Sequence, residues 1–280
     1  MKQVFRARPL FAVAAVLVFG STAMQAHHSW RSYHWARTTS VLSLQVGDNV
    51  GSQWDAYLDE AISDWNVSSV LDLNKTTGGT NPATCDPTPG RIEACNGAYG
   101  QNGWLGIAQI WITGRTHITQ ATTKLNDTYF AMATYNTPAW RRLVTCQEIA
   151  HDFGLDHQDE RNNNTNLGSC MDYTNDPDGG AGGYSSNDPS NEHPNAHDFE
   201  QLLTIYGHTD SFNTSTSTGA AGAAAPSVKA RRPEAAQWGQ LVRTSPDNRV
   251  QTYEKDLGNG NRLVTHVFWA NPEEDGHDHH

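Results

Sequence analysis

Apolar and polar positions in the first half of the chain predict strands arranged around one helix. Residues 39–46 alternate apolar and polar side chains, as a strand with one buried face does. In residues 53–65 the large apolar side chains recur every three or four positions, which predicts an amphipathic helix. Residues 67–73 predict another strand. After a loop rich in Gly, Pro and Asn, residues 105–112 and 117–125 predict two more strands.

The second half resumes a regular pattern after a long polar segment. Residues 162–194 are rich in Asn, Asp and Gly and predict a solvated loop. Residues 199–206 have the apolar spacing of a helix that would close the lower half of the domain. Short runs at 240–244, 250–255 and 262–269 predict a small β unit. Three short strands are marginally stable alone, so we expect this unit to pack on the rest of the chain or on a partner.

Composition divides the chain into five parts. Three basic residues precede an apolar run from Leu10 to Phe19, and small residues near Ala23 and Ala26 offer cleavage sites, as in a signal peptide. Residues 214–233 shift to the Ser, Thr, Gly, Ala and Pro that are typical of a flexible linker. We therefore expect a signal peptide (1–26), a main domain (27–212), a linker (213–233), the β unit (234–270) and an acidic, His-rich tail (271–280).

Charge and the expected signal peptide limit the partners. The formal net charge is −11, and loss of Lys2, Arg6 and Arg8 with the signal peptide would make it −14. Such acidity argues against nucleic-acid and anionic-membrane partners. The N-terminal apolar run is shorter than the roughly 20 residues of a membrane-spanning helix. A secreted, extracellular or periplasmic protein is therefore expected, with its oligomeric state left open.

The strongest chemical signal is a set of potential metal ligands between Gln147 and His157. Residues four apart lie on one face of a helix, so Gln147 and His151 would point at a common space with Glu148 beside them. Gly154 can end the helix with a left-handed turn and bring His157 back as a third ligand. A buried amphipathic helix with ordinary core histidines is the alternative interpretation.

This segment resembles the zinc motif H-E-x-x-H-x-x-G-x-x-H of the metzincin clan of endopeptidases, with a matrixin-like arrangement and with Gln147 in place of the first histidine. Met171, in the sequence Ser-Cys-Met-Asp-Tyr, is similar to the methionine of the clan's Met-turn. The resemblance covers roughly residues 38–207. It implies an α/β (α+β) domain with a twisted mixed sheet, an active-site helix and a Met-turn under the metal. It also implies an edge strand on which a peptide substrate adds as a further strand, at Leu105, Gly106, Ile107 and Ala108.

The resemblance assigns a role to each site residue. Gln147, His151 and His157 would hold zinc and leave one coordination position for water. Glu148 would take a proton from that water and pass it to the leaving amine. Tyr173 would stabilise the oxyanion, or would simply hydrogen-bond nearby backbone. The expected function is a zinc endopeptidase acting on a protein or peptide substrate.

Gln147 leaves a second hypothesis open. Its amide oxygen can coordinate zinc, although imidazole suits zinc better. The chain is then either an active peptidase that holds its metal more weakly, or a catalytically inactive protein of the same fold that binds peptides or proteins. A glycan-binding protein is a third possibility. Most tryptophans fall in apolar helix or strand patterns, which argues against a sugar-binding surface. Asp176, Asp178 and Asp188 could also hold calcium. Their spacing is not that of an EF-hand, so a solvated loop is favoured there.

Four cysteines in an exported chain predict two disulfides, for which three pairings exist. Cys85 and Cys95 flank a turn-rich segment and can close a short loop. Cys146 directly precedes the motif, and Cys170 directly precedes Met171. A Cys146–Cys170 bond would tie the ligand-bearing helix to the Met-turn.

Overall fold

The computed structural model describes residues 28–181, 184–215 and 235–271, so the expected signal peptide, most of the linker and the tail lie outside the described residues. Among the described residues, nine strands join into one sheet in the order β3-β2-β4-β6-β5-β9-β8-β7, with β1 beside β6. The strands are β1 (His34–Trp35), β2 (Leu42–Asn49), β3 (Leu71–Thr77), β4 (Arg91–Gly97), β5 (Trp104–Thr113), β6 (His117–Asn126), β7 (Gln240–Thr244), β8 (Val250–Gly258) and β9 (Asn261–Trp269). The helices are α1 (Asp55–Trp65), α2 (Asp127–Phe130), α3 (Pro138–His151), α4 (Ala196–Ile205) and α5 (Ala235–Trp238).

The sheet has a parallel part and an antiparallel part. β2 pairs in parallel with β3 and β4, and β4 pairs in parallel with β6. β5 runs antiparallel to β6, and β9, β8 and β7 continue the antiparallel order. The predicted α/β (α+β) class with a mixed sheet is therefore confirmed. The strands expected in residues 240–269 form, and they join the main sheet through β9.

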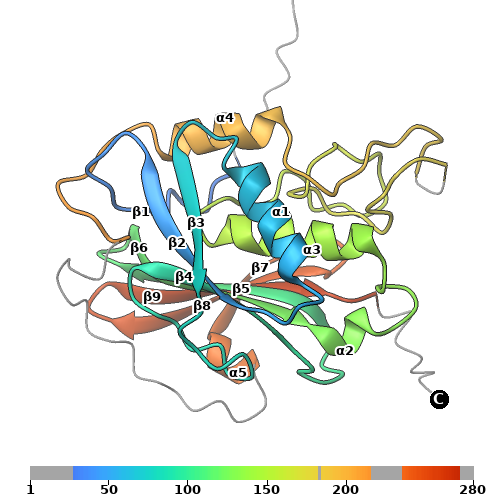
Figure 1. Cartoon of the computed structure of the whole chain (residues 1–280), viewed down its shortest axis with the longest axis horizontal. Coiled ribbons are helices and arrows are strands. Elements are labelled where there is room, and N and C mark those ends of the chain that lie inside the picture. Colours follow the sequence, from blue (N-terminus) through green and yellow to red (C-terminus); the bar gives the residue numbers. More distant parts are fainter. Residues whose placement is uncertain (1–27, 182–183, 216–234, 272–280) are drawn as a thin grey trace, which may run out of the picture.

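Helices α1 and α3 pack against each other, and α3 also contacts β5, β6 and β9 (Figure 1). The apolar stripe of α1 explains this packing, because Leu58, Ala61, Ile62 and Trp65 are its buried residues. Helix α4 begins with a capping box. The Asn195 side chain accepts a hydrogen bond from the backbone N–H of Asp198, and the Asp198 side chain accepts one from the backbone N–H of Asn195. These contacts hold α3, with its candidate ligands, against the sheet and beside α1.

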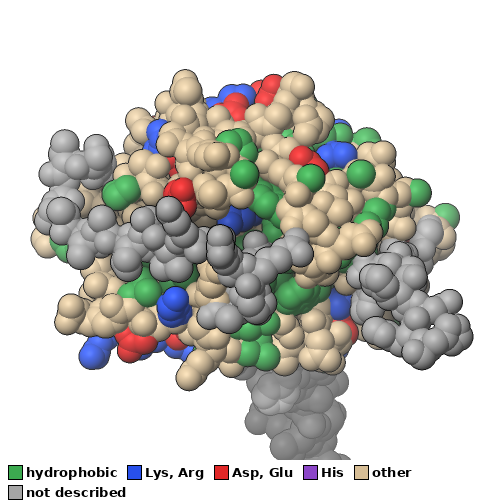
Figure 2. Space-filling model, turned by 90° about the horizontal axis from the view of Figure 1, so that it is seen from below, with side chains coloured by type: hydrophobic (Ala, Val, Ile, Leu, Met, Phe, Trp, Pro, Cys, Tyr) green, Lys and Arg blue, Asp and Glu red, His purple; other side chains and the backbone are tan. Residues whose placement is uncertain are grey.

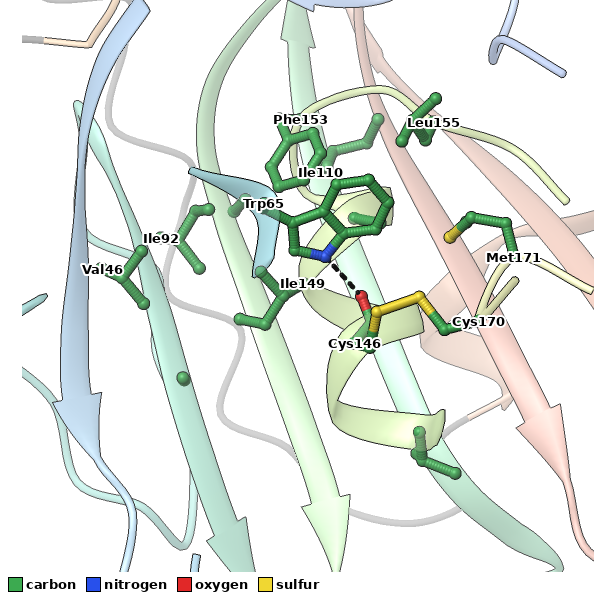
Figure 3. Close-up of a cluster of buried hydrophobic side chains, with 14 of the residues drawn as sticks. Val46, Trp65, Ile92, Ile110, Cys146, Ile149, Phe153, Leu155, Cys170 and Met171 are labelled. Carbon is green, nitrogen blue, oxygen red and sulfur yellow. Dashed lines mark hydrogen bonds between the residues drawn. A yellow bond between two sulfur atoms is a disulfide. The ribbon is translucent and has the colours of Figure 1, made fainter. Parts of the chain in front are cut away.

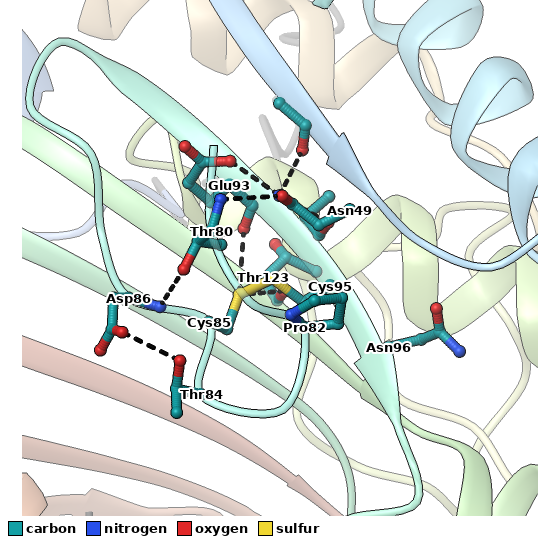
Figure 4. The surroundings of a disulfide bond; sticks show 12 residues. Asn49, Thr80, Pro82, Thr84, Cys85, Asp86, Glu93, Cys95, Asn96 and Thr123 are labelled. Atoms are coloured by element: carbon teal, nitrogen blue, oxygen red, sulfur yellow. Dashed lines mark hydrogen bonds between the residues drawn. A yellow bond between two sulfur atoms is a disulfide. The ribbon is translucent and has the colours of Figure 1, made fainter. Parts of the chain in front are cut away.

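The segment expected to be a loop between β3 and β5 contains β4, and this part of the prediction was wrong. Residues 92–96 are all buried, so β4 lacks the alternation of a half-exposed strand. The Cys85–Cys95 disulfide fastens the preceding turn to β4 (Figure 4). Asn49 supports the same region, since its Nδ2 donates to Glu93 Oε2 at 2.7 Å.

The lower face of the molecule has a mixed surface. Seen from below, hydrophobic, acidic and basic side chains lie scattered among polar ones (Figure 2). The side chains of β7 are all exposed. Among the described residues, the helices are all too short or too polar to cross a bilayer.

Candidate metal centre

Helix α3 carries three candidate residues on its buried surface. Thr137 caps the helix by accepting a backbone hydrogen bond, and Pro138 occupies the first turn, where its missing N–H costs nothing. Gln147, Glu148 and His151 are 0, 1 and 1% exposed. Buried polar side chains on a helix require partners, and the surroundings of these three decide what the site can do.

A disulfide joins α3 to the turn that contains Met171. Cys146 and Cys170 form this bond, and Trp65 Nε1 donates to Cys146 O at 3.1 Å (Figure 3). Met171 itself is fully buried. Gln158 N donates to Met171 O at 2.6 Å, which connects the Met171 turn to the chain just after His157.

The chain reverses after α3 at Gly154. The helix ends at His151, and Gly154 has φ +97°, in the left-handed region that glycine adopts without strain. A Cβ atom at Gly154 would lie 2.2 Å from Tyr33 O, so the turn also requires the absence of a side chain. The reversal brings His157 against His151, with their Nε2 atoms 3.1 Å apart.

The surroundings of these two imidazoles determine which ring atoms are free. His151 Nδ1 lies 2.8 Å from Leu155 O, a hydrogen bond that only a protonated Nδ1 can donate. The Nδ1 atom of His157 lies 3.5 Å from Asp156 and 3.6 Å from Glu160 carboxylate oxygens, which favour a proton there. In each neutral ring the lone pair is then on Nε2. Two Nε2 atoms 3.1 Å apart that both carry lone pairs repel each other unless a proton or a cation lies between them.

His266, on β9, completes a group of three imidazoles. Its ring stacks on that of His151 at 4.0 Å between centroids and 7° between planes. One ring nitrogen from each of His151, His157 and His266 lies within 4.8 Å of the others. His266 is 1% exposed, and within the described part of the chain both of its ring nitrogens are buried without a hydrogen-bond partner. Trp30 also packs on His266, at 3.5 Å between ring centroids.

The three histidines fit a zinc ion by their chemistry. Burial lowers the pKa of His151 to about 3, and burial together with the other two histidines lowers the pKa of His266 well below its usual range. Burial also acts to lower the pKa of His157, but Asp156 and Glu160 outweigh it and the net shift is upward. Neutral imidazole is a preferred zinc ligand. A cation here would satisfy the one ring nitrogen of His266 that carries a lone pair.

Glu148 lies against the backbone of β5. A Cβ atom at Gly106 would meet Glu148 Oε1 at 2.6 Å and Val144 Cγ1 at 2.7 Å, so the glycine provides the room for this carboxyl. Glu148 Oε2 is buried without a hydrogen-bond partner. Burial, with a smaller contribution from the charge of Asp152, raises the pKa of Glu148 well above its usual range. A nearby cation would act in the opposite direction and favour the carboxylate.

The remaining two candidates have protein partners. Gln147 Nε2 donates to Cys170 O at 2.7 Å, while its Oε1 is buried without a partner and keeps its lone pairs. Tyr173 donates from its hydroxyl to Arg249 O at 3.0 Å and stacks on Phe268 at 4.4 Å between centroids. Tyr173 also meets His157 edge-on at 5.3 Å. The ring of Tyr173 therefore lies beside His157, while its hydroxyl is bound to the backbone between β7 and β8.

The expected edge strand is an interior strand, which corrects that expectation. β9 pairs with the side of β5 that β6 leaves open, and it covers the stretch Gly106, Ile107 and Ala108. The register places His266 opposite Ala108. The pattern of β5 could not reveal this, because strand pairing depends on residues far along the chain. His266 was likewise missed, since its only local signal is a histidine inside an apolar strand pattern.

A second group of potential ligands lies away from these histidines. It contains His34, His208 and Asp210, and the Nε2 atoms of the two histidines are 3.1 Å apart. His117 Nε2 lies 3.1 Å from Asp210 Oδ1. The side chain of His208 is 53% exposed, in contrast to the buried trio. Any measurement of metal binding must separate the two groups.

Comparisons with known proteins give little further information. Searches against protein-family models and curated proteins found no match to the chain. Among solved structures, the chain is similar to high choriolytic enzyme 1, a hatching enzyme zinc-protease from the medaka fish Oryzias latipes, at 13% sequence identity and a TM-score of 0.34. The match covers 63% of this chain and 95% of that chain. A likeness this distant leaves the function to be inferred from the residues of the site.

Proposed function

We propose that the protein is a secreted zinc-dependent endopeptidase of the metzincin type. The observation that carries the proposal is the approach of His151 and His157, whose Nε2 atoms lie 3.1 Å apart. Glu148, beside them on α3, is a carboxyl in a buried environment next to a strand. Imidazole ligands combined with one adjacent carboxyl are the donor set of a hydrolytic metal site.

The proposed ligands are His151, His157 and the amide oxygen of Gln147. Zinc bound there would polarise a peptide carbonyl and acidify water. Glu148 would accept the proton of the attacking water and transfer it to the leaving amine. Tyr173, once its hydroxyl is released from Arg249 O, would donate a hydrogen bond to the carbonyl oxygen of the substrate. The carboxylates of Asp156 and Glu160 would orient His157 through Nδ1.

A catalytically inactive binding protein of the same fold is the alternative. Gln147 favours it, because an amide oxygen is a weaker zinc ligand than imidazole. The glycan-binding alternative has less support. Among the nine tryptophans of the chain, seven are buried, which is the burial expected of core residues: Trp30, Trp35, Trp54, Trp65, Trp104, Trp140 and Trp238.

The test replaces the proposed base. Glu148→Gln should lower zinc-dependent cleavage of a mixed peptide library at least about a hundredfold, because the carboxylate is lost while the size is kept. Zinc content should not fall. Glu200→Gln is the matched control, since this side chain of α4 is 67% exposed. Undiminished cleavage by Glu148→Gln would exclude the mechanism, and absence of cleavage by every zinc-loaded form would favour the binding protein.

A further inference from the structure

The C-terminal unit, defined as α5 and β7–β9 in residues 235–271, lies along the edge of β5 opposite β6. β9 runs antiparallel to β5 and pairs with it from Trp104 to Ile112. A peptide that adds to a strand uses the same backbone donors and acceptors. Apolar contacts fasten the unit in place, because Trp238 and Val267 cluster with Trp104 and Ile107. The chain thus supplies its own strand where the proposed function requires the substrate.

His266 sits on this strand at the position nearest the proposed zinc ligands. It lies opposite Ala108 and stacks on His151 at 4.0 Å. Neither of its ring nitrogens has a hydrogen-bond partner among the described residues, although the residue is 1% exposed. An unpartnered buried imidazole is costly unless an ion or another ligand satisfies it. With Gln147, His151 and His157 bound to zinc, an imidazole from His266 would fill the fourth position, which a catalytic site keeps for water.

Other parts of the C-terminal unit contact Tyr173 and the two carboxylates beside His157. Arg249 O accepts the hydroxyl hydrogen bond of Tyr173 at 3.0 Å. Arg243, on β7, pairs with the Asp156 carboxylate and with that of Glu160, the latter at 2.5 Å. These two carboxylates are the ones that face His157. The C-terminal unit therefore contacts β5, where the substrate would add, and the pair His151 and His157. It also contacts Tyr173 and the carboxylates that face His157.

The described structure consequently represents a closed site. Glu148, His151 and His266 are each 1% exposed, so a protein substrate has no path to them while β9 is in place. We propose that the C-terminal unit is a built-in inhibitor that takes the place of the peptide substrate along β5 and seals the zinc with His266. This inference rests on the proposed function. Its metal-binding part is tested without any measurement of activity.

The first experiment measures zinc affinity of the full chain by competition with a chromophoric chelator. His266→Phe keeps a ring of similar size but removes the ligand, and it should weaken the tight site at least about tenfold, or 1.4 kcal/mol. His266→Ala serves if the phenylalanine disturbs folding. Thr265→Val and His208→Ala are the controls and should not change this affinity. Unchanged affinity in both His266 variants, or equal weakening by Thr265→Val, would overturn the assignment of His266 as a ligand.

The second experiment asks whether the strand blocks the site or belongs to the working enzyme. Acetohydroxamic acid, a small metal chelator, is titrated against the cobalt-loaded full chain and followed by the visible absorption of the cobalt. His266→Ala should bind it at least about tenfold more tightly than wild type, because a coordination position becomes free. Equal binding by the two would overturn the inhibitor proposal.

Peptide cleavage separates the two proposals. At saturating zinc, His266→Ala should cleave faster than wild type if β9 is an inhibitor, because loss of the His266 ligand to zinc makes it easier for β9 to leave β5 and admit a peptide. Slower cleavage would make His266 a permanent ligand of the enzyme and would overturn the inhibitor, while the endopeptidase function would stand. If no form cleaves any peptide, the endopeptidase fails, and the affinity and acetohydroxamic acid results still decide whether His266 closes the metal site.

Discussion

At position 147, where the zinc motif that this segment resembles has a histidine, the chain has a glutamine whose two amide atoms have different surroundings. The nitrogen is bound to Cys170 O, while the oxygen is buried and has no hydrogen-bond partner in the residues that the structure describes. The first bond fixes the orientation of the amide. It leaves the oxygen as the atom available to a cation, which is the arrangement that a coordinating glutamine requires.

Substitution of Gln147 tests this role. Gln147→His should tighten zinc binding at least about tenfold, or 1.4 kcal/mol, because imidazole suits zinc better than an amide oxygen. Gln147→Ala should loosen zinc binding relative to wild type. Chelator competition measures both. Equal affinity in wild type and Gln147→Ala would show that the glutamine is not a ligand.

The predictability of site residues depends on how local their arrangement is. Glu148, His151 and His157 belong to one helix and one turn, so their spacing alone indicated a common site. His266 reaches the same place through the pairing of β9 with β5, which no short-range spacing encodes. The sequence also could not show that Tyr173 would be bound to Arg249 O, because that contact depends on the turn between β7 and β8.

At the scale of elements, helix α3, which carries the proposed ligands, is linked to the Met171 turn. Cys146 and Cys170 make this link, in the pairing that the sequence favoured. Strands β2, β5 and β6 and helix α1 also form close to their expected positions, since each has a clear apolar period. β4 was missed because a strand buried on both faces shows no alternation.

Removal of each disulfide in turn shows whether that bond supports the stability of the fold alone or also zinc binding. By the loop-entropy model, Cys146→Ala/Cys170→Ala and Cys85→Ala/Cys95→Ala should each lower the free energy of unfolding by about 3 kcal/mol. Only the first pair should also weaken zinc binding, because it frees α3 from the Met171 turn. Urea unfolding and chelator competition provide the two measurements. An equal loss of zinc affinity in both variants would contradict the role given to the Cys146–Cys170 bond.

At the scale of the whole molecule, one continuous sheet joins the proposed catalytic part to the C-terminal unit. The N-terminal segment joins them too, since Trp30 packs on His266 and Arg31 pairs with Glu254 at 3.0 Å. His28 lies two residues before Trp30, and its Nδ1 is hydrogen-bonded to Asp156 O at 2.8 Å. Its Nε2 is 3.6 Å from Asp198 Oδ1, and both of these atoms lack a hydrogen-bond partner.

The His28–Asp198 contact predicts a pH dependence of stability. Burial raises the pKa of Asp198 to about 6 and lowers that of His28 to about 4. The pKa of this carboxyl is near 4 in the unfolded chain and about 6 in the fold. As the pH rises through this interval, the free energy of unfolding therefore falls, by up to about 3 kcal/mol. Asp198→Asn removes this cost, and its amide can donate to His28 Nε2. The variant should therefore be more stable than wild type above pH 7, with a difference that shrinks towards pH 4 in thermal melts. A difference that is constant with pH would contradict this account.

The central claim is that the segment from Gln147 to His157 is a working peptidase site which the chain's own C-terminal strand closes. The most direct measurement compares zinc-dependent peptide cleavage by wild type, His266→Ala and His266→Ala/Glu148→Gln. The account predicts that His266→Ala cleaves at least about tenfold faster than wild type, and that the double variant falls at least about a hundredfold below it at equal zinc content. Equal rates in the single and double variants, or no gain over wild type in His266→Ala, would contradict the account.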